Sequence, residues 1–145
     1  MMETIAMASD HAGYTLKCAL KEYLNEKGYN VLDFGTDSEE SCDYPDYAHP
    51  AALAVENGEA AFGVAMCGTG NGIQITLNKH QGIRAALCWR PELAALAKEH
   101  NNANFLVLPA RFVSYDEAIG ILNAYLEAKF EGGRHQRRID KISCR

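Results

Sequence analysis

Long apolar runs are missing from this 145-residue sequence, and none approaches the roughly 20 residues that a membrane-spanning helix needs. The first residues, Met1 to Ile5, lack the basic and apolar regions of a secretory signal. Internal repeats, low-complexity segments and linkers are missing too. We therefore expect a single cytoplasmic domain over residues 1–145, with no membrane contact and with enough chain for a sizeable core.

Paired cysteines are also missing. The five cysteines are an odd number, their spacing is irregular, and none forms a Cys-x-x-Cys pair. This pattern argues against a disulfide framework and against a zinc knuckle. His49, His80 and His135 show no metal-ligand spacing and no tight carboxylate cluster beside them. We predict reduced thiols, no bound metal and no other cofactor.

A broad basic surface is the third feature that the sequence lacks. The net charge is −5, and the segment 33–46 holds six acidic residues and no basic one. Residues 130–145 carry five Lys or Arg and two acidic residues, which leaves −8 for the rest of the chain. This distribution argues against nucleic-acid binding. A short basic tail on an acidic body suits a small anionic ligand better.

Short apolar runs alternate with segments of helical periodicity along the whole chain. The runs 5–8, 29–34, 61–67, 83–88 and 105–108 predict strands. Helices are expected from about 16 to 28, over 48–57, after the glycines to about 80, over 91–100, and from the capping box at Ser114 to about 130, with a loop over 35–47. This alternation predicts an α/β domain: a five-stranded parallel, Rossmann-like sheet with helices on both faces.

Ligands of such sheets bind beyond the carboxyl ends of the strands. That rule gathers Asp10 and His11 after the first strand, residues 67–72 after the third, and Arg111 after the fifth. Asp10 can alternatively be a helix cap. The sequence therefore predicts a polar site at this edge of the sheet.

Cys67 begins the most distinctive segment, Cys67-Gly68-Thr69-Gly70-Asn71-Gly72. Glycines let backbone N–H groups converge on an anion, and a helix N-terminus favours a thiolate, which is a better base than a thiol. A lone buried cysteine is more often a small core residue, but the glycine turn favours a chemical role here. The turn does not fit the Gly-x-Gly-x-x-Gly fingerprint, the P-loop or the cysteine phosphatase loop, since Ile73-Gln74 follows it.

Two further candidates lie near the end of the chain. His100 and Asn101 close the fourth predicted helix, where histidine suits acid–base work but is also common near a helix end. Arg134 and Arg138 are four residues apart, so one helical turn presents both to a phosphate dianion. The alternative for the arginines is a solvated basic tail.

Further short motifs join the residues quoted above, and together they extend along almost the whole chain. These motifs are Asp43-Tyr44-Pro45, Asn78-Lys79, Gly82 to Ala85, His100 to Asn104 and Gly132 to His135. In them the sequence resembles the type B ribose-5-phosphate isomerases, a family that includes galactose-6-phosphate isomerase subunits. The resemblance implies a metal-free aldose–ketose isomerase of a sugar phosphate that works through an enediolate, in a homodimer or homotetramer with shared active sites. Ile73 stands where a second branch of the family has a carboxylate base, so the chain resembles the cysteine branch.

The resemblance also implies roles for single residues. Cys67 is expected to be the base and His100 the acid that opens the furanose ring. The N–H groups of Gly68 to Gly72 are expected to hold the oxyanion, with help from Thr69. Asp10 and Tyr44 are expected to act on the ring and the hydroxyl groups, and Asn101 to contact the substrate. The phosphate is expected to be held by His11, Arg111, Arg134 and Arg138.

The non-oxidative pentose phosphate reaction, ribose 5-phosphate to ribulose 5-phosphate, is the favoured function. One alternative is an isomerase of allose or galactose 6-phosphate. The other is a non-catalytic phosphate-binding module, which would have no need for both Cys67 and His100. We further expect Cys67 of one subunit to work with His100 of another.

Overall fold

Five parallel strands form one sheet in the order β2-β1-β3-β5-β4. The computed structural model describes residues 3–144. The strands are β1 (Thr4–Ser9), β2 (Asn30–Asp33), β3 (Phe62–Cys67), β4 (Ala85–Leu87) and β5 (Phe105–Pro109). All four pairings are parallel. The five predicted strands and the parallel sheet are thereby confirmed.

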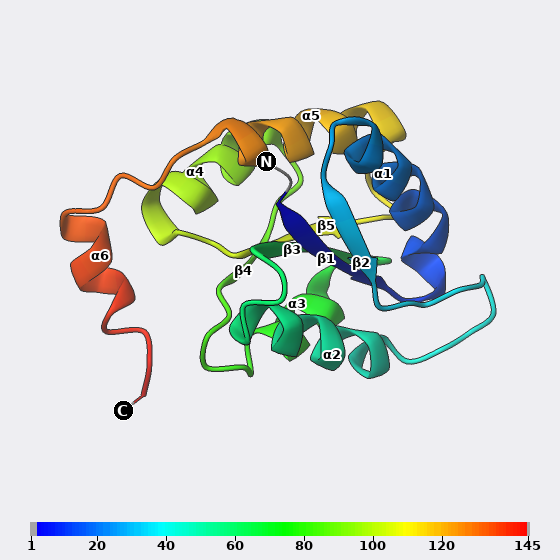
Figure 1. Ribbon diagram of the computed structural model, residues 1–145, viewed down its shortest axis with the longest axis horizontal. Coiled ribbons are helices and arrows are strands. Elements are labelled where there is room, and N and C mark those ends of the chain that lie inside the picture. The colour runs from blue at the N-terminus through cyan, green and yellow to red at the C-terminus, as the bar shows by residue number, and fades with distance from the viewer. Residues whose placement is uncertain (1–2, 145) are drawn as a thin grey trace.

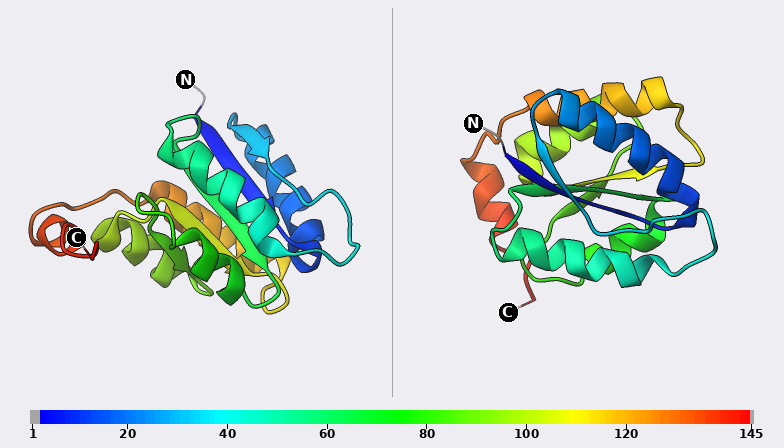
Figure 2. Two further views of the ribbon diagram at one scale, coloured as in Figure 1. Left: turned by 90° about the horizontal axis from the view of Figure 1, so that it is seen from below. Right: turned by 45° about the vertical axis from the view of Figure 1, so that its right-hand side comes forward.

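The helices cover both faces of the sheet (Figure 2). They are η1 (His11–Gly13), α1 (Tyr14–Glu26), α2 (Tyr44–Glu56), α3 (Asn71–Leu77), α4 (Pro91–Asn101), α5 (Tyr115–Glu127) and α6 (Arg134–Ile139). Figure 1 shows α1, α4 and α5 above the sheet and α2 and α3 below it, while α6 lies beyond the end of α4. The α/β class with helices on both faces is therefore as predicted.

The two faces of the sheet pack differently. On the side of α1, α4 and α5, large side chains such as Met7, Met66 and Leu106 fill the core. On the side of α2 and α3, alanines dominate, including Ala6, Ala52 and Ala65. Small side chains let α2 approach the sheet closely. This brings the first turn of α2 near the carboxyl end of β3.

The helix α2 begins earlier than predicted. The sequence predicted a loop over 35–47, whereas α2 starts at Tyr44, with Pro45 in its first turn. Proline is suited to that position because its missing N–H has no partner there in any helix. The last long helix ends at Glu127 rather than about 130, and its predicted capping box between Ser114 and Glu117 is confirmed. The early start of α2 matters because it gives Tyr44 a fixed place.

The free edge of β4 is closed by amide side chains. Asn78 Oδ1 accepts a hydrogen bond from the Ala85 N–H at 2.8 Å. The Ala85 carbonyl accepts from Asn78 Nδ2 at 3.0 Å and from Gln74 Nε2 at 3.1 Å. Side chains of α3 and of the residue after it thus satisfy backbone groups that an edge strand would otherwise leave open.

None of the helices in residues 3–144 combines the length and the apolar character that a membrane crossing requires.

Candidate active site

Cys67 lies at the carboxyl end of β3, beside the end of β5. Its side chain is 4% exposed. Its carbonyl accepts a hydrogen bond from Ala110 N–H at 2.9 Å, and the Gly68 carbonyl accepts from Arg111 N–H at 3.0 Å. These bonds fasten the start of the glycine turn to the turn after β5. Residues 67 and 111, far apart in sequence, therefore meet at one edge, as predicted.

The glycine turn after Cys67 has a conformation that requires glycine. Gly70 has φ of +79°, and a Cβ added there would lie 2.4 Å from Leu87 Cδ1. An L residue would be strained in its backbone and would also clash. Thr69 Oγ1 accepts a hydrogen bond from Asn71 N–H at 3.2 Å, which holds the turn from inside. The turn is thus compact and fixed.

Tyr44 and Arg111 pack directly against this turn. A Cβ on Gly72 would lie 2.4 Å from Tyr44 Cζ, and one on Gly68 would lie 3.0 Å from Arg111 Nη1. Because these two glycines have no side chains, a phenol and a guanidinium can approach the backbone next to Cys67. A thiol, a hydroxyl and a fixed positive charge are thereby gathered around a short stretch of backbone.

Asp10 and His11 follow β1 at the same edge. Asp10 is 7% exposed, and its Oδ1 accepts hydrogen bonds from the N–H groups of Ala12 and Gly13. The capping alternative for Asp10 is therefore confirmed, and within residues 3–144 its Oδ2 accepts no hydrogen bond. His11 Nδ1 accepts from Cys42 N–H at 3.2 Å. That bond leaves Nε2 of His11 to carry the ring proton when the ring is neutral.

His100 and Asn101 lie elsewhere, at the end of α4. Arg84, the residue before β4, donates from Nε to the Asn101 carbonyl and from Nη2 to the Asn102 carbonyl. His100 lies in the last turn of α4, as the helix-end alternative predicts, and the cap itself is Asn102, with φ of +46°. A pocket of about 430 Å³ lies alongside β4 and is lined by Arg84 and Asn101, but not by Cys67. His100 and Asn101 therefore belong to the amino edge of the sheet.

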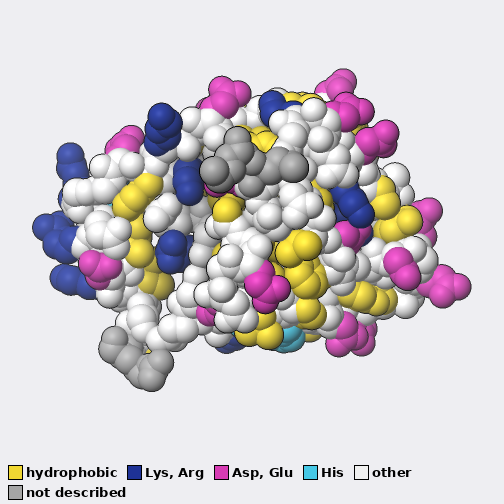
Figure 3. All heavy atoms as spheres, viewed as in Figure 1, with side chains coloured by type: hydrophobic (Ala, Val, Ile, Leu, Met, Phe, Trp, Pro, Cys, Tyr) yellow, Lys and Arg dark blue, Asp and Glu magenta, His cyan; other side chains and the backbone are white. Residues whose placement is uncertain are grey.

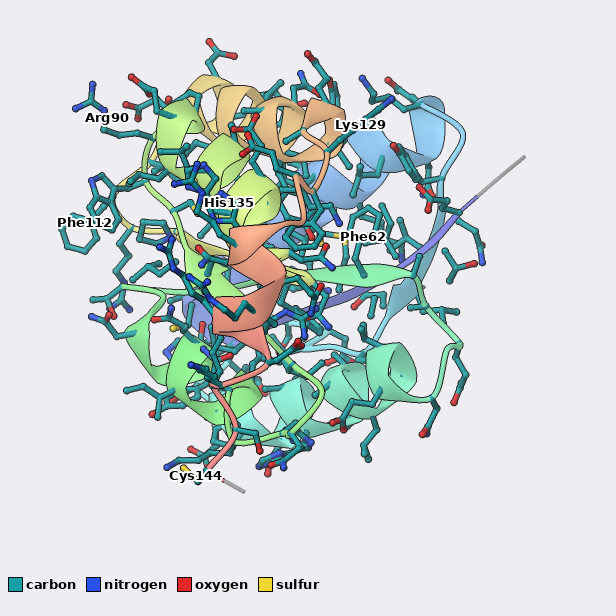
Figure 4. The ribbon with its side chains drawn as sticks, turned by 90° about the vertical axis from the view of Figure 1, so that its left-hand side faces the viewer. Phe62, Arg90, Phe112, Lys129, His135 and Cys144 are labelled. Carbon is teal, nitrogen blue, oxygen red and sulfur yellow. The ribbon has the colours of Figure 1, made fainter. Side chains whose placement is uncertain are left out.

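Arg134 and Arg138 lie on α6, which confirms that the tail can form a helix. This helix packs on α4. The imidazoles of His100 and His135 stack with centroids 4.2 Å apart and planes 12° apart. Figure 4 looks onto this end of the molecule and shows His135 at the start of α6, next to α4. The arginines are consequently neighbours of His100, not of Cys67.

The predicted site residues thus form two groups at opposite edges of one chain. The helix α4 has 11 residues and spans about 16 Å. It starts after the carboxyl end of β4 and ends before the amino end of β5. Cys67 pairs in register with Pro109 at the far end of β5. Within a single chain, Cys67 and His100 are therefore too far apart to act on one small molecule.

The two ends of the molecule also differ in charge. Figure 3 shows Lys and Arg side chains gathered at the end formed by α6, and Asp and Glu side chains at the opposite end. The acidic end includes the loop before α2, which carries Asp37, Glu39 and Glu40. Arg111 is the guanidinium beside Cys67, whereas Arg134 and Arg138 lie on α6 at the other end. The positive charge available to a phosphate dianion is therefore greater at the end formed by α6.

Sequence reasoning gave no role to four residues next to these groups. Cys42 holds His11, and Glu131 and His135 surround His100. Ser9 Oγ is, within residues 3–144, the one buried side-chain polar atom without a hydrogen-bond partner. Glu131 and His135 are four residues apart, but Glu131 precedes α6, so the two residues do not share a helical turn. Nothing in the sequence connects Cys42 with His11.

Known proteins match this chain along almost its whole length. The family model described as Ribose/Galactose Isomerase matches residues 5–142. Ribose-5-phosphate isomerase B of Escherichia coli is 46% identical, and the match covers 99% of this chain and 96% of the relative. The crystal structure of a ribose 5-phosphate isomerase from Thermotoga maritima superposes with a TM-score of 0.96 at 51% identity, over 98% of both chains.

A third relative contains a ligand. The crystal structure of ribose-5-phosphate isomerase B from Mycoplasma genitalium has ribulose-5-phosphate bound. It has a TM-score of 0.92 and 47% identity, over 98% of this chain and 95% of that one. The family match extends across nearly the whole chain, and the chain has the fold of these relatives. The chain therefore belongs to the ribose/galactose isomerase family, among the type B ribose-5-phosphate isomerases.

Proposed function

We propose that the protein interconverts ribose 5-phosphate and ribulose 5-phosphate at sites made by two copies of the chain. The observation that carries the proposal is the separation of the two groups of site residues within one chain, which we call half-sites. Cys67, the glycine turn, Tyr44 and Arg111 meet at one edge, while His100, Asn101, Arg134 and Arg138 lie at the other. A symmetric pair of chains can bring opposite edges together twice, because each interface contact then occurs in two copies.

Ring opening is the first step of the proposed reaction. His100 of one copy donates a proton to the ring oxygen as the C1–O bond breaks, and Asp10 or Tyr44 of the other copy receives the hydroxyl proton. The product is the open-chain aldehyde. His100 is 40% exposed, so in this role it depends on a second chain to exclude water from its ring.

Proton transfer is the second step. The thiolate of Cys67 removes the proton on C2 of the aldehyde and returns it to C1, while a proton moves between the two oxygens. The N–H groups of the glycine turn, with Thr69, stabilise the negative charge on the enediolate oxygen. Each such donor can contribute about 3–4 kcal/mol, and a placed acid or base about 10²–10⁴-fold in rate. Removal of an α proton is otherwise too slow for an exposed thiolate.

The phosphate is proposed to lie between His11 and Arg111 of one copy and Arg134 and Arg138 of the other. Bidentate guanidinium contacts suit a dianion. In this arrangement the basic end of one copy lies next to the acidic end of the other, so their charges attract. Hexose 6-phosphates remain the alternative substrates, so activity on ribose 5-phosphate, allose 6-phosphate and galactose 6-phosphate should be measured side by side.

Mixing two inactive variants tests the shared site. Cys67→Ala and His100→Ala should each abolish turnover. When subunits exchange, each mixed dimer regains one intact site and loses both groups from the other site. Activity should reappear in proportion to the mixed species, measured by native mass spectrometry. A mixture that exchanges but stays inactive would show that the two groups do not act across an interface. Full activity of His100→Ala alone would remove His100 from the mechanism.

A further inference from the structure

Three potential metal ligands meet where α6 packs on the end of α4. The imidazole nitrogens of His100 and His135 and a carboxylate oxygen of Glu131 all lie within 4.8 Å of one another. Glu131 Oε1 is 3.7 Å from His100 Nε2 and 3.5 Å from His135 Nε2. Figure 4 shows His135 facing this end of the molecule. Two imidazoles and one carboxylate are a donor set that suits zinc.

The spacing of these atoms fits a bound ion better than hydrogen bonds. Hydrogen bonds to carboxylates bring nitrogen and oxygen within about 2.7–3.2 Å. Ligands at about 2.0–2.2 Å around a tetrahedral zinc ion lie about 3.4 Å from each other. Both distances from Glu131, 3.5 and 3.7 Å, are close to that separation. The two distances from Glu131 are therefore near those of a metal site, and the two imidazole nitrogens lie within 4.8 Å of each other.

A second cluster of the same composition shows the contrast. On α2 and the turn after α3, His49 Nδ1 and His80 Nε2 are 2.7 Å apart and hydrogen-bonded. His80 Nδ1 is 3.3 Å from Glu56, whose other oxygen accepts from the Gly82 N–H at 2.7 Å. These groups already satisfy one another, and two nitrogens at 2.7 Å leave no room for an ion between them. In the His100 cluster, Glu131 makes only the longer ion-pair contacts of 3.5 and 3.7 Å with the two imidazoles.

The surrounding backbone fixes the cluster but leaves its side chains free to adjust. The Glu131 N–H donates to the Glu99 carbonyl at 3.0 Å, which holds the connection to α6 beside the end of α4. Carbonyl groups at a helix C-terminus favour a cation, whereas Arg134 and Arg138 on α6 oppose it. The stacked rings must tilt so that both lone pairs converge. His100 and Glu131, 40% and 53% exposed, have space to move.

We propose that His100, Glu131 and His135 form a site for a divalent transition metal of the zinc class, and that the occupied site inhibits the enzyme. The metal binds the lone pair of His100 that otherwise holds the proton for ring opening. The inhibition rests on the proposed role of His100, whereas metal binding rests on the cluster alone. The metal is an inhibitor here, and the isomerisation itself needs none.

Binding is tested on the Cys67→Ala variant, so that the proposed catalytic thiolate cannot bind the probe. Cobalt(II) is the probe, read by its visible absorption, and zinc should displace it. One ion per chain is expected. Adding Glu131→Gln or His135→Ala should weaken binding by at least about tenfold, whereas His49→Ala, in the other histidine cluster, should change nothing. Unweakened cobalt binding in the Glu131 and His135 variants would overturn the site.

Inhibition is tested on the chain with Cys67 intact. Prolonged chelation should leave its turnover unchanged, and added zinc should then inhibit it. The His135→Ala variant, measured against its own metal-free turnover, should resist zinc. Equal inhibition of both would mean that zinc acts elsewhere, at Cys67 for example, and would overturn the inhibitory role. Metal binding with no effect on turnover would instead contradict the function proposed for His100, so the two failures are distinguishable.

Discussion

The two edges of the sheet are built in different ways. At the carboxyl edge, Cys67 and Asp10 are almost fully buried. Backbone hydrogen bonds join the start of the glycine turn after Cys67 to the turn that carries Arg111. At the amino edge, His100 is 40% exposed and stacks on a helix that follows an extended segment. We call the first the rigid edge, because hydrogen bonds within the chain hold it. We call the second the adjustable edge, because its side chains are partly exposed.

The proposed function gives the two edges different work. Proton transfer from carbon and stabilisation of an oxyanion depend on groups placed to within about half an ångström. Opening a ring and holding a phosphate tolerate side chains that adjust. The rigid edge suits the first task and the adjustable edge the second. Variants at each edge should therefore affect different kinetic constants.

The largest effect is expected at the rigid edge. Cys67→Ala should lower turnover by about 10²–10⁴-fold or more, since it removes the base, while substrate affinity is retained. Cys88→Ala is the matched control. Cys88 is 1% exposed, and burial raises the pKa of its thiol to about 11, so it cannot serve as a base near neutrality. Turnover and ligand affinity of both variants are measured. Near-normal turnover of Cys67→Ala would exclude the cysteine mechanism.

At the adjustable edge the expected effect is on substrate binding. Arg134→Ala or Arg138→Ala should raise KM by about 10–150-fold, the equivalent of about 1.5–3 kcal/mol for a charge-assisted bond. Arg137→Ala, an arginine of the same helix with no proposed phosphate contact, is the control. Steady-state kinetics with ribose 5-phosphate and binding of unphosphorylated ribose distinguish arginines that bind the phosphate from arginines of a solvated tail. Unchanged affinities in all three variants would make α6 a solvated end of the chain.

The smallest expected effect concerns the stability of the rigid edge in acid. Burial alone would raise the pKa of Asp33, but hydrogen bonds from Lys17 and the Gly35 N–H outweigh it and lower the pKa. Lys17, at 2.7 Å from Asp33, is 1% exposed. A carboxyl whose folded pKa is lowered stabilises the fold above its unfolded pKa of about 4, and that contribution is lost as the pH falls through the folded value.

Asp33→Asn should therefore reduce the free energy of unfolding near neutral pH by about 1–3 kcal/mol and flatten its decline in acid. Denaturant unfolding of both proteins between neutral and acidic pH gives the comparison. Asp37→Asn, in the exposed loop nearby, is the control. Parallel pH curves for Asp33→Asn and the unaltered protein would show that this ion pair does not stabilise the carboxyl edge.

Much of the fold could be predicted because local signals agreed with it. Continuous apolar runs marked the buried parallel strands, and glycines or a capping box marked helix ends. The start of α2 was missed because Tyr44-Pro45 reads equally as a turn, and only packing of the phenol on Gly72 decides between them. The sheet-edge rule correctly placed Cys67 with Arg111. Placing Glu131 and His135 beside His100 required the packing of α6 on α4, which no spacing in the sequence reveals.

The amide side chains along β4 have a consequence for how copies of this chain can meet. A strand from another molecule could extend the sheet at this edge only by displacing Asn78 and Gln74 from Ala85. The exchange would replace three satisfied bonds with new ones and gain little. Extension of the sheet from one molecule to the next is thereby disfavoured at Ala85.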